Sequence, residues 1–159
     1  MENILHDFNE NVTSLMVDFL KNSIMDGGLS NFTDDLNDRL MQLGLDLTKF
    51  AITYAEDVIF NLKERKNEFE SLEKDDRKIV SIFGEIDFKR RYYYDKENNE
   101  RVYLLDEYFK IAPKERFLEN VETKLIEEAI ETNYEKAGKV AAYKTEISKQ
   151  TVMNKISEL

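Results

Sequence analysis

The stretch "IFGEIDFKRRYYY", residues 82–94, decides the fold class because its side chains alternate with a period of two. One set of alternate positions holds Ile82, Gly84, Ile86, Phe88, Arg90, Tyr92 and Tyr94. Alternation of this kind is typical of a half-buried β-strand. The run "DKENNE", residues 95–100, supplies turn residues, and "RVYLL", residues 101–105, is predicted to return as the second strand of a β-hairpin.

Before this hairpin, apolar residues recur every three to four positions, which predicts two amphipathic helices. The first helix is predicted to end at Gly27 and Gly28, and its apolar face holds Ile4, Leu5, Phe8, Val12, Leu15, Met16, Phe19 and Ile24. The second is predicted to begin at Thr33, a capping residue, with Asp34 and Asp35 in its first turn. Its apolar residues repeat near every 3.5 positions, at Leu36, Leu40, Leu43, Leu47, Phe50 and Tyr54. We expect the two helices to pack as a hairpin or to pair with a second copy of the chain.

A charged run, "NLKERKNEFESLEKDDRK", connects these helices to the predicted hairpin over residues 61–78. It contains neither Gly nor Pro, so it is predicted to extend the second helix as an exposed arm and to mark a boundary. The predicted domains are an acidic helical region over 1–77, which could dimerise, a small sheet over 78–112, and a helical region over 113–159 that follows Pro113, the only proline.

Helical spacing returns after Pro113, and the apolar stripe holds Phe117, Val121, Leu125, Ile126 and Ile130. Two further short helices are predicted, one in "NYEKAGKVAAY" and one in "SKQTVMNKISEL", residues 148–159. The chain is therefore predicted to be α+β, with an N-terminal helical hairpin, a small antiparallel β-sheet and a C-terminal helical bundle.

The order of the last helices predicts that the bundle ends in a helix-turn-helix, in which a small residue sits where the first helix crosses the second. The candidates for that crossing are Ala137, Ala141 and Ala142, and Ile147 is the candidate for the apolar residue that anchors the turn. A crossing at Ala142 gives a tight turn, whereas a crossing at Ala137 gives a turn several residues longer. The sequence leaves both arrangements open.

The last predicted helix has an apolar side and a polar side. At about 100° per residue, Val152, Ile156 and Leu159 point inward, while Gln150, Thr151, Asn154 and Ser157 point outward. Gln and Asn can pair with adenine in the major groove, and the flanking Lys149 and Lys155 suit phosphate contacts. Outward polar residues are nevertheless common on any short surface helix.

A second basic cluster, "KRRYYY", begins with Lys89, Arg90 and Arg91. Basic residues beside aromatic ones can hold phosphates and stack on bases. Arginine and tyrosine are equally at home in the strands of a half-exposed hairpin, which is the alternative interpretation.

Composition excludes several classes of function. The formal net charge is −10, and it is uneven, with 8 basic and 17 acidic residues in 1–77 against 15 and 16 in 78–159. The chain has no cysteine and one histidine, His6, so a zinc site or an ordinary catalytic triad is not expected. No metal, cofactor or catalytic residue is predicted. No twenty-residue apolar run or signal peptide is found, so we expect no membrane contact and a cytoplasmic location.

Three segments carry a resemblance to a known family: residues 81–117, "NYEKAGKV" at 133–140 and "ISKQTVMNKI" at 147–156. In this order they resemble the N-terminal region of the ISLre-type insertion-sequence transposases, a bacterial family formerly described as uncharacterised. The resemblance spans roughly residues 79–156. It implies that this part binds the ends of a mobile element, while a later RNase H-like domain, absent from these 159 residues, uses acidic residues and magnesium to cut DNA.

The resemblance therefore implies no catalytic residue in this chain and a DNA-reading role for residues 147–156 only. The predicted partner is double-stranded DNA at element ends, with a homodimer through the N-terminal helices as a further expectation. The alternative function is a non-enzymatic helical module for protein–protein interaction or dimerisation. Salt separates the two, because phosphate contacts weaken steeply as ionic strength rises whereas apolar helix pairing does not.

Overall fold

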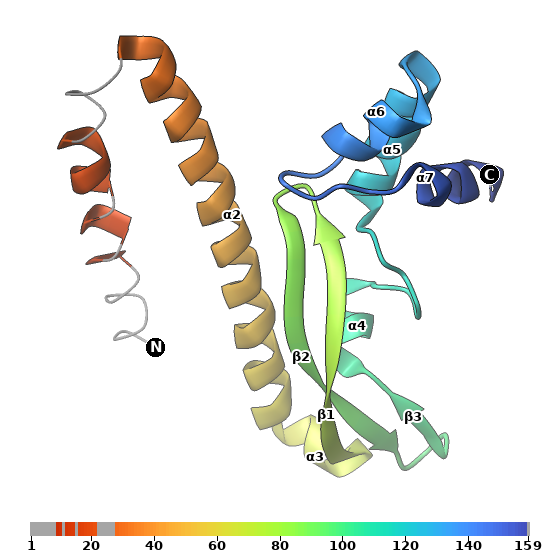
Figure 1. The fold of residues 1–159 in the computed structure, drawn as a ribbon. Coiled ribbons are helices and arrows are strands. Elements are labelled where there is room, and N and C mark those ends of the chain that lie inside the picture. Colours follow the sequence, from red (N-terminus) through yellow and green to blue (C-terminus); the bar gives the residue numbers. More distant parts are fainter. Residues whose placement is uncertain (1–8, 11, 15, 22–27, 159) are drawn as a thin grey trace. The chain divides into compact units, whose positions relative to one another are not determined.

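The computed structural model describes residues 9–10, 12–14, 16–21 and 28–158, which fall in two compact units, Met1–Gln42 and Leu43–Leu159 (Figure 1). Part of the predicted first helix, Ile4, Leu5, Phe8, Leu15 and Ile24, lies outside the described residues, as do His6, Gly27 and Leu159.

The first unit contains helical residues between 9 and 21 and the first half of α2, which spans Gly28–Asn61. Phe19 is buried, and its ring stacks on that of Phe32 with 5.3 Å between centroids. The Arg39 guanidinium lies over the Phe19 ring at 4.7 Å, which adds a cation–π contact. The predicted helical hairpin is therefore held at this point by an aromatic pair.

Helix α2 differs from the sequence prediction at its start and in the face that it buries. Thr33 does not cap it, because the helix already begins at Gly28 and the Thr33 hydroxyl donates to the Ser30 carbonyl at 2.7 Å. Of the predicted seam, Leu40 is 50% exposed and Leu47 is 44% exposed. The residues of α2 that are buried in the second unit are Ile52, Glu56 and Ile59, on a different side of the helix.

The prediction that residues 61–78 form a helical arm was wrong. A short helix, α3 (Lys63–Glu68), ends there and strand β1 follows at Phe69–Ser81. The charges belong to an exposed strand whose side chains pair across to its neighbour, as Lys78 does with Asp87 at 3.0 Å. Because both faces of β1 are exposed over 72–76, no apolar alternation marked it as a strand. The predicted boundary after Arg77 falls inside β1.

The sheet has three antiparallel strands in the order β1-β2-β3, with β2 at Gly84–Asp95 and β3 at Glu100–Val102. The main partner of the predicted strand is therefore β1, not residues 101–105. Strands β1 and β2 meet in a two-residue turn after Ser81, and Gly84 there takes a φ of +123°, which favours glycine. Residues Leu104–Phe109 form helix α4 instead of continuing β3.

Three helices complete the chain: α5 at Glu119–Glu131, α6 at Tyr134–Val140 and α7 at Lys149–Ser157. The segment before α5 adds a parallel bridge to the sheet, in which Val80 N donates to Arg116 O at 2.8 Å and Leu118 N donates to Val80 O at 3.0 Å. These helices lie at the turn end of the β1–β2 hairpin, and the second half of α2 runs along the hairpin (Figure 1).

Two clusters of buried side chains form the core of the second unit. One joins α2, the sheet and α4 through Ile52, Ile59, Ile79, Ile86, Phe88, Tyr93, Leu105 and Ile111. The other joins the end of β1 to the last three helices through Val80, Phe117, Val121, Leu125, Ala137, Ala141, Ala142, Ile147 and Val152.

A buried carboxylate lies between α2 and the sheet. Glu56 is 2% exposed, and its Oε1 accepts the backbone N–H of Arg91 at 3.0 Å and lies 3.4 Å from Arg91 Nε. Burial raises the pKa of Glu56 above its ordinary value, and the contacts with Arg91 oppose that rise. Glu56 on α2 therefore supplies the hydrogen-bond acceptor for the Arg91 amide on β2. The cost is that the Glu56 carboxylate is removed from water.

We expect Glu56→Ala to lower the free energy of unfolding by about 3 kcal/mol, because it leaves the partly buried guanidinium and backbone amide of Arg91 without this acceptor. Glu56→Gln keeps an acceptor oxygen and should cost clearly less. Because the folded-state pKa of Glu56 is raised, its carboxyl stabilises the fold most when protonated, and the wild-type advantage over Glu56→Gln should shrink as pH rises above about 4.5. Urea unfolding at several pH values measures both effects, and a constant difference between the two proteins would contradict the second.

Candidate nucleic-acid interface

The predicted helix-turn-helix corresponds to α6, the turn over residues 141–148, and α7, all packed against α5. Ile147, the predicted anchor of the turn, is 6% exposed, and Val152, the inward residue of α7, is fully buried. Both belong to the cluster that includes Val121 and Leu125 of α5. The orientation of α7 is thus fixed by apolar packing, which leaves its opposite face in solvent.

The closest approach between α6 and the turn occurs at Gly138. Ile147 N donates to Gly138 O at 2.9 Å, and a Cβ built on Gly138 would lie 2.0 Å from Ile147 O. Only a hydrogen fits there. The crossing is therefore next to Ala137, and the longer of the two turns left open by the sequence is the one observed. The signal that could have found it is a glycine inside a helical pattern.

Ser148 caps α7 as its position in the sequence suggests. Its Oγ accepts the Thr151 backbone N–H at 3.2 Å and lies 2.8 Å from the Thr151 hydroxyl. The Thr151 side chain is consequently occupied at the cap, and it is only partly exposed. Thr151, one of the predicted DNA-binding residues, therefore contacts the cap at the start of α7 and does not project from the outer face of the helix.

The outer face of α7 presents Lys149, Gln150 and Asn154, which are all exposed. Gln150 Nε2 donates to Asn154 Oδ1 at 2.9 Å, one turn along the helix. Each amide keeps one further polar atom, an acceptor on Gln150 and a donor on Asn154. The pair thus offers the combination of one donor and one acceptor that an adenine edge can meet.

Lys155 points toward α5 and not outward. Its Nζ lies 2.5 Å from Glu122 Oε1 and 3.7 Å from Glu158 Oε2. The hydrogen bond to Glu122 raises the pKa of Lys155 above its ordinary value. Lys155 thus joins α7 to α5, and it is the less suitable of the two predicted phosphate-binding lysines of this helix.

The second basic cluster is divided by the strand. Arg90 is 7% exposed, pairs with Asp106 of α4 and lies 3.5 Å from the centre of the Tyr103 ring. Arg91 pairs with Glu56, and its guanidinium lies 3.7 Å from the centre of the Phe60 ring. These contacts occupy both guanidinium groups inside the protein, so we leave Arg90 and Arg91 out of the interface. Lys89 remains exposed, 3.5 Å from Asp76.

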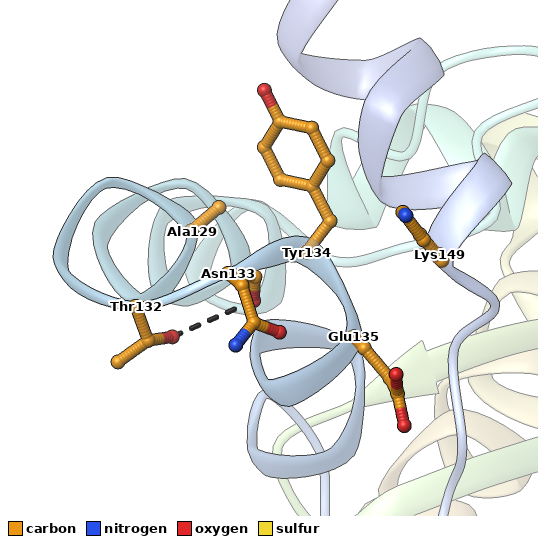
Figure 2. A pocket seen from close by; sticks show the side chains of 6 residues that line it. All are labelled: Ala129, Thr132, Asn133, Tyr134, Glu135 and Lys149. Carbon is orange, nitrogen blue, oxygen red and sulfur yellow. Dashed lines mark hydrogen bonds between the residues drawn. The ribbon is translucent and has the colours of Figure 1, made fainter.

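A cavity of about 530 Å³ lies between the α5–α6 connection and the start of α7. Figure 2 shows the six side chains that line it. Asn133 caps α6 there by accepting the Lys136 N–H at 2.9 Å, and the Thr132 hydroxyl lies 3.5 Å from the Asn133 carbonyl. Glu135 pairs with Lys139 at 2.8 Å. Within the part of the chain that the structure describes, no ion pair is found for Lys149, whose ammonium group borders this cavity from the α7 side.

The described residues contain no group of three or more His, Asp or Glu side chains placed to hold a metal ion. None of the helices in the described ranges is long and apolar enough to cross a bilayer.

We expect Gly138→Ala to lower the free energy of unfolding by about 3 kcal/mol, because the new methyl group overlaps a backbone oxygen that has no side-chain freedom to move away. Lys136→Ala, on an exposed position of the same helix, is the matched control and should change stability by less than about 0.5 kcal/mol. Thermal and urea unfolding measure both. Equal stability of the two variants would show that α6 and the turn do not cross at Gly138.

Comparison with known proteins gives one family. A sequence model of the uncharacterised protein family UPF0236 matches residues 28–159. Three UPF0236 proteins of Caldanaerobacter subterraneus subsp. tengcongensis are each 32% identical to the chain over all 159 residues. The chain spans 33% of the length of each, and the names of two of them join eleven and four numbered designations. No solved structure matches the chain. Because the family model covers well over half of its residues, the protein belongs to the UPF0236 family.

Proposed function

We propose that this chain is a DNA-binding part of a bacterial insertion-sequence transposase and that it recognises the ends of the element through α7. The observation that carries the proposal is the outer face of α7, where Gln150, Asn154 and Lys149 stand exposed on a helix whose other side is fixed by Val152. Helix-turn-helix proteins read the major groove with a helix held in this way.

The local charge supports contact with a polyanion. Residues 134–158 carry five lysines and three glutamates, although the whole chain has a net charge of −10. Lys149 is the phosphate contact that we favour, because its ammonium group is exposed at the start of the reading helix. Lys155 and the two arginines of β2 have structural partners and no part in this proposal.

The relatives support the mobile-element part of the proposal. One UPF0236 protein carries eleven designations in a single strain. Several copies of one gene would produce such a name, and copying within a genome is the behaviour of an insertion sequence. The resemblance of residues 79–156 to the ISLre-type transposases points the same way. On this proposal the protein acts in the cytoplasm, on duplex DNA, with catalysis left to other parts of the transposase.

A second candidate function is helix-mediated dimerisation. Leu40 and Leu47 are exposed and lie one heptad apart on α2, a spacing that suits pairing with a second amphipathic helix. Such pairing is compatible with DNA binding, since two copies would present two reading helices. Sedimentation of the wild-type chain and of Leu40→Glu/Leu47→Glu at several concentrations tests this candidate, and an unchanged monomer in both cases would remove it.

We expect Gln150→Ala/Asn154→Ala to bind duplex DNA from the flanks of the gene about tenfold more weakly while its affinity for a shuffled duplex stays the same. Fluorescence anisotropy with both duplexes, at low and near-physiological salt, measures the ratio. Circular dichroism of the variant should match the wild type, since both side chains are exposed. A wild-type protein that binds the two duplexes equally at both salt concentrations would contradict sequence-specific recognition.

We expect Lys149→Ala to weaken binding to every duplex by a similar factor and to reduce the slope of log affinity against log salt by about 0.9, the loss expected for one phosphate contact. Lys124→Ala, at an exposed position of α5, is the control of equal charge. The same salt slope in Lys149→Ala and in the wild type would remove Lys149 from the phosphate-binding residues.

A further inference from the structure

A second cavity, of about 630 Å³, lies between β3, α4 and the loop over residues 110–114. Five basic and three acidic residues line it, so its lining is positive in a protein whose net charge is −10. None of the residues at its rim belongs to α6 or α7. The cavity is thus separate from the face that we propose reads DNA.

The positive charge of this cavity is only partly balanced by its own walls. Arg90 and Asp106 neutralise each other as a buried pair. Arg77 uses one end of its guanidinium for the carbonyl of Glu115 at 2.5 Å and that of Ala112 at 3.3 Å, which holds it in place without cancelling its charge. The other charged residues of the lining are two acids, Glu100 and Glu107, and four cations, Arg77, Arg101, Lys110 and Lys114. Two further acids bind lining residues from outside: Glu115 Oε2 accepts the Ala112 N–H at 2.7 Å, and Asp75 Oδ2 accepts the Tyr103 hydroxyl at 2.8 Å.

The two lysines of the loop are held in an unusual backbone conformation. Lys110 has a φ of +54° at the end of α4, and Lys114 has a φ of +68°. Glycine fits this left-handed region without strain, and it is the usual residue after a helix end. Lysine at both positions places two ammonium groups at the same cavity at the expense of backbone strain. Neither lysine has an ion pair among the described residues. Backbone strain at residues without such a structural partner is typical of functional sites.

From this geometry we propose that the cavity is a phosphate-binding site, in which Lys110, Lys114 and Arg101 contact the anion and Arg77 contributes charge from the wall. Arg101 can offer two parallel N–H groups to phosphate oxygens, and the lysines act as point charges. The ligand is a phosphate group, either in a nucleic-acid backbone or in a small phosphorylated molecule.

The distance from the cavity to the hairpin turn, which contacts the connection before α7, suits a nucleic-acid backbone. Arg90, at the cavity wall, lies six residues along β2 from Gly84, where the hairpin meets the turn before α7. At about 3.3 Å per residue this is roughly 20 Å, less than one turn of duplex DNA. The nucleic-acid arm of the proposal rests on the proposed function, whereas the small-molecule arm does not.

The test uses Lys110→Gly/Lys114→Gly, which removes both charges and relieves the backbone strain. The midpoint of thermal unfolding should not fall. Calorimetry with inorganic pyrophosphate and anisotropy with a 20-base-pair duplex then measure binding. We expect at least a tenfold loss of affinity for one of the two probes, and for the duplex also a salt slope lower by about two, as the loss of two phosphate contacts requires. Lys63→Ala/Lys124→Ala, which removes two charges from exposed positions of α3 and α5, should change neither.

The two sources give different results. Loss of duplex affinity alone, with no pyrophosphate binding by the wild type, assigns the site to a nucleic-acid backbone. Loss of pyrophosphate binding with unchanged duplex affinity assigns it to a small phosphorylated molecule. Unchanged binding of both probes, or equal losses in the control variant, overturns the proposal. Failure of Gln150→Ala/Asn154→Ala to alter DNA recognition would leave this result intact, because those residues lie outside the cavity.

Discussion

The opposite directions of two neighbouring side chains at the end of β1 join the two halves of the larger unit. Ile79 and Val80 are neighbours in the chain and point to opposite faces of the strand, where Ile79 packs with α2 and α4 and Val80 packs with the last three helices. The backbone of Val80 also binds the segment before α5 through two hydrogen bonds. A shift of β1 by one residue would exchange these two side chains and disconnect both clusters. The position of α7 therefore depends on the register of a strand far from it in sequence.

Alternation along β2 explains why two neighbouring arginines of the basic run contact different helices. Arg90 and Arg91 are adjacent, so the strand sends one toward α4 and the other toward α2. Each arginine pairs with a carboxylate, and an aromatic ring covers the flat face of each guanidinium. The charges thus bind a helix to each side of the sheet. Buried pairs of this kind contribute little net stability, but the loss of one partner is costly, which favours a single arrangement of helices around the hairpin.

The sequence could predict those parts of the fold in which burial follows a simple period. The strand alternation over residues 84–90, the helices after Pro113 and the inward position of Val152 on α7 were predicted correctly, because Ile86, Phe88 and Val152 face a core at the expected spacing. The predicted alternation fails after Arg90, where Tyr93 is fully buried instead of Tyr92 and Tyr94, and Ile130 of the predicted apolar stripe is 79% exposed. Strand β1 was missed because its charged residues face solvent on both sides. The face that α2 buries in the second unit includes Glu56, a residue that no hydrophobic pattern selects, so the sequence did not reveal this face. The pairing of the exposed leucines with a second copy stays a prediction.

The sequence predicted the candidate site only for those side chains whose exposure does not depend on a partner distant in the sequence. Lys149, Gln150 and Asn154 are exposed as their positions on the helix indicate. The partners of Lys155, Arg90 and Arg91 come from Glu122, Asp106 and Glu56, which are distant in sequence, and no local pattern reveals such pairs. Gly138 was missed for a related reason, since its role depends on the backbone of Ile147 lying against it.

The turn between α6 and α7 is hydrogen-bonded, at an internal residue, to the turn that joins β1 and β2. Tyr143 N donates to Ile82 O at 3.1 Å, and the Tyr143 carbonyl packs closely against Gly84. An eight-residue connection held at one internal point behaves as two short connections, each with far fewer conformations than the whole. The α7 helix is therefore pre-organised. On the proposed function, little conformational entropy would be lost when α7 docks on DNA, so more of its contact energy would be available as affinity.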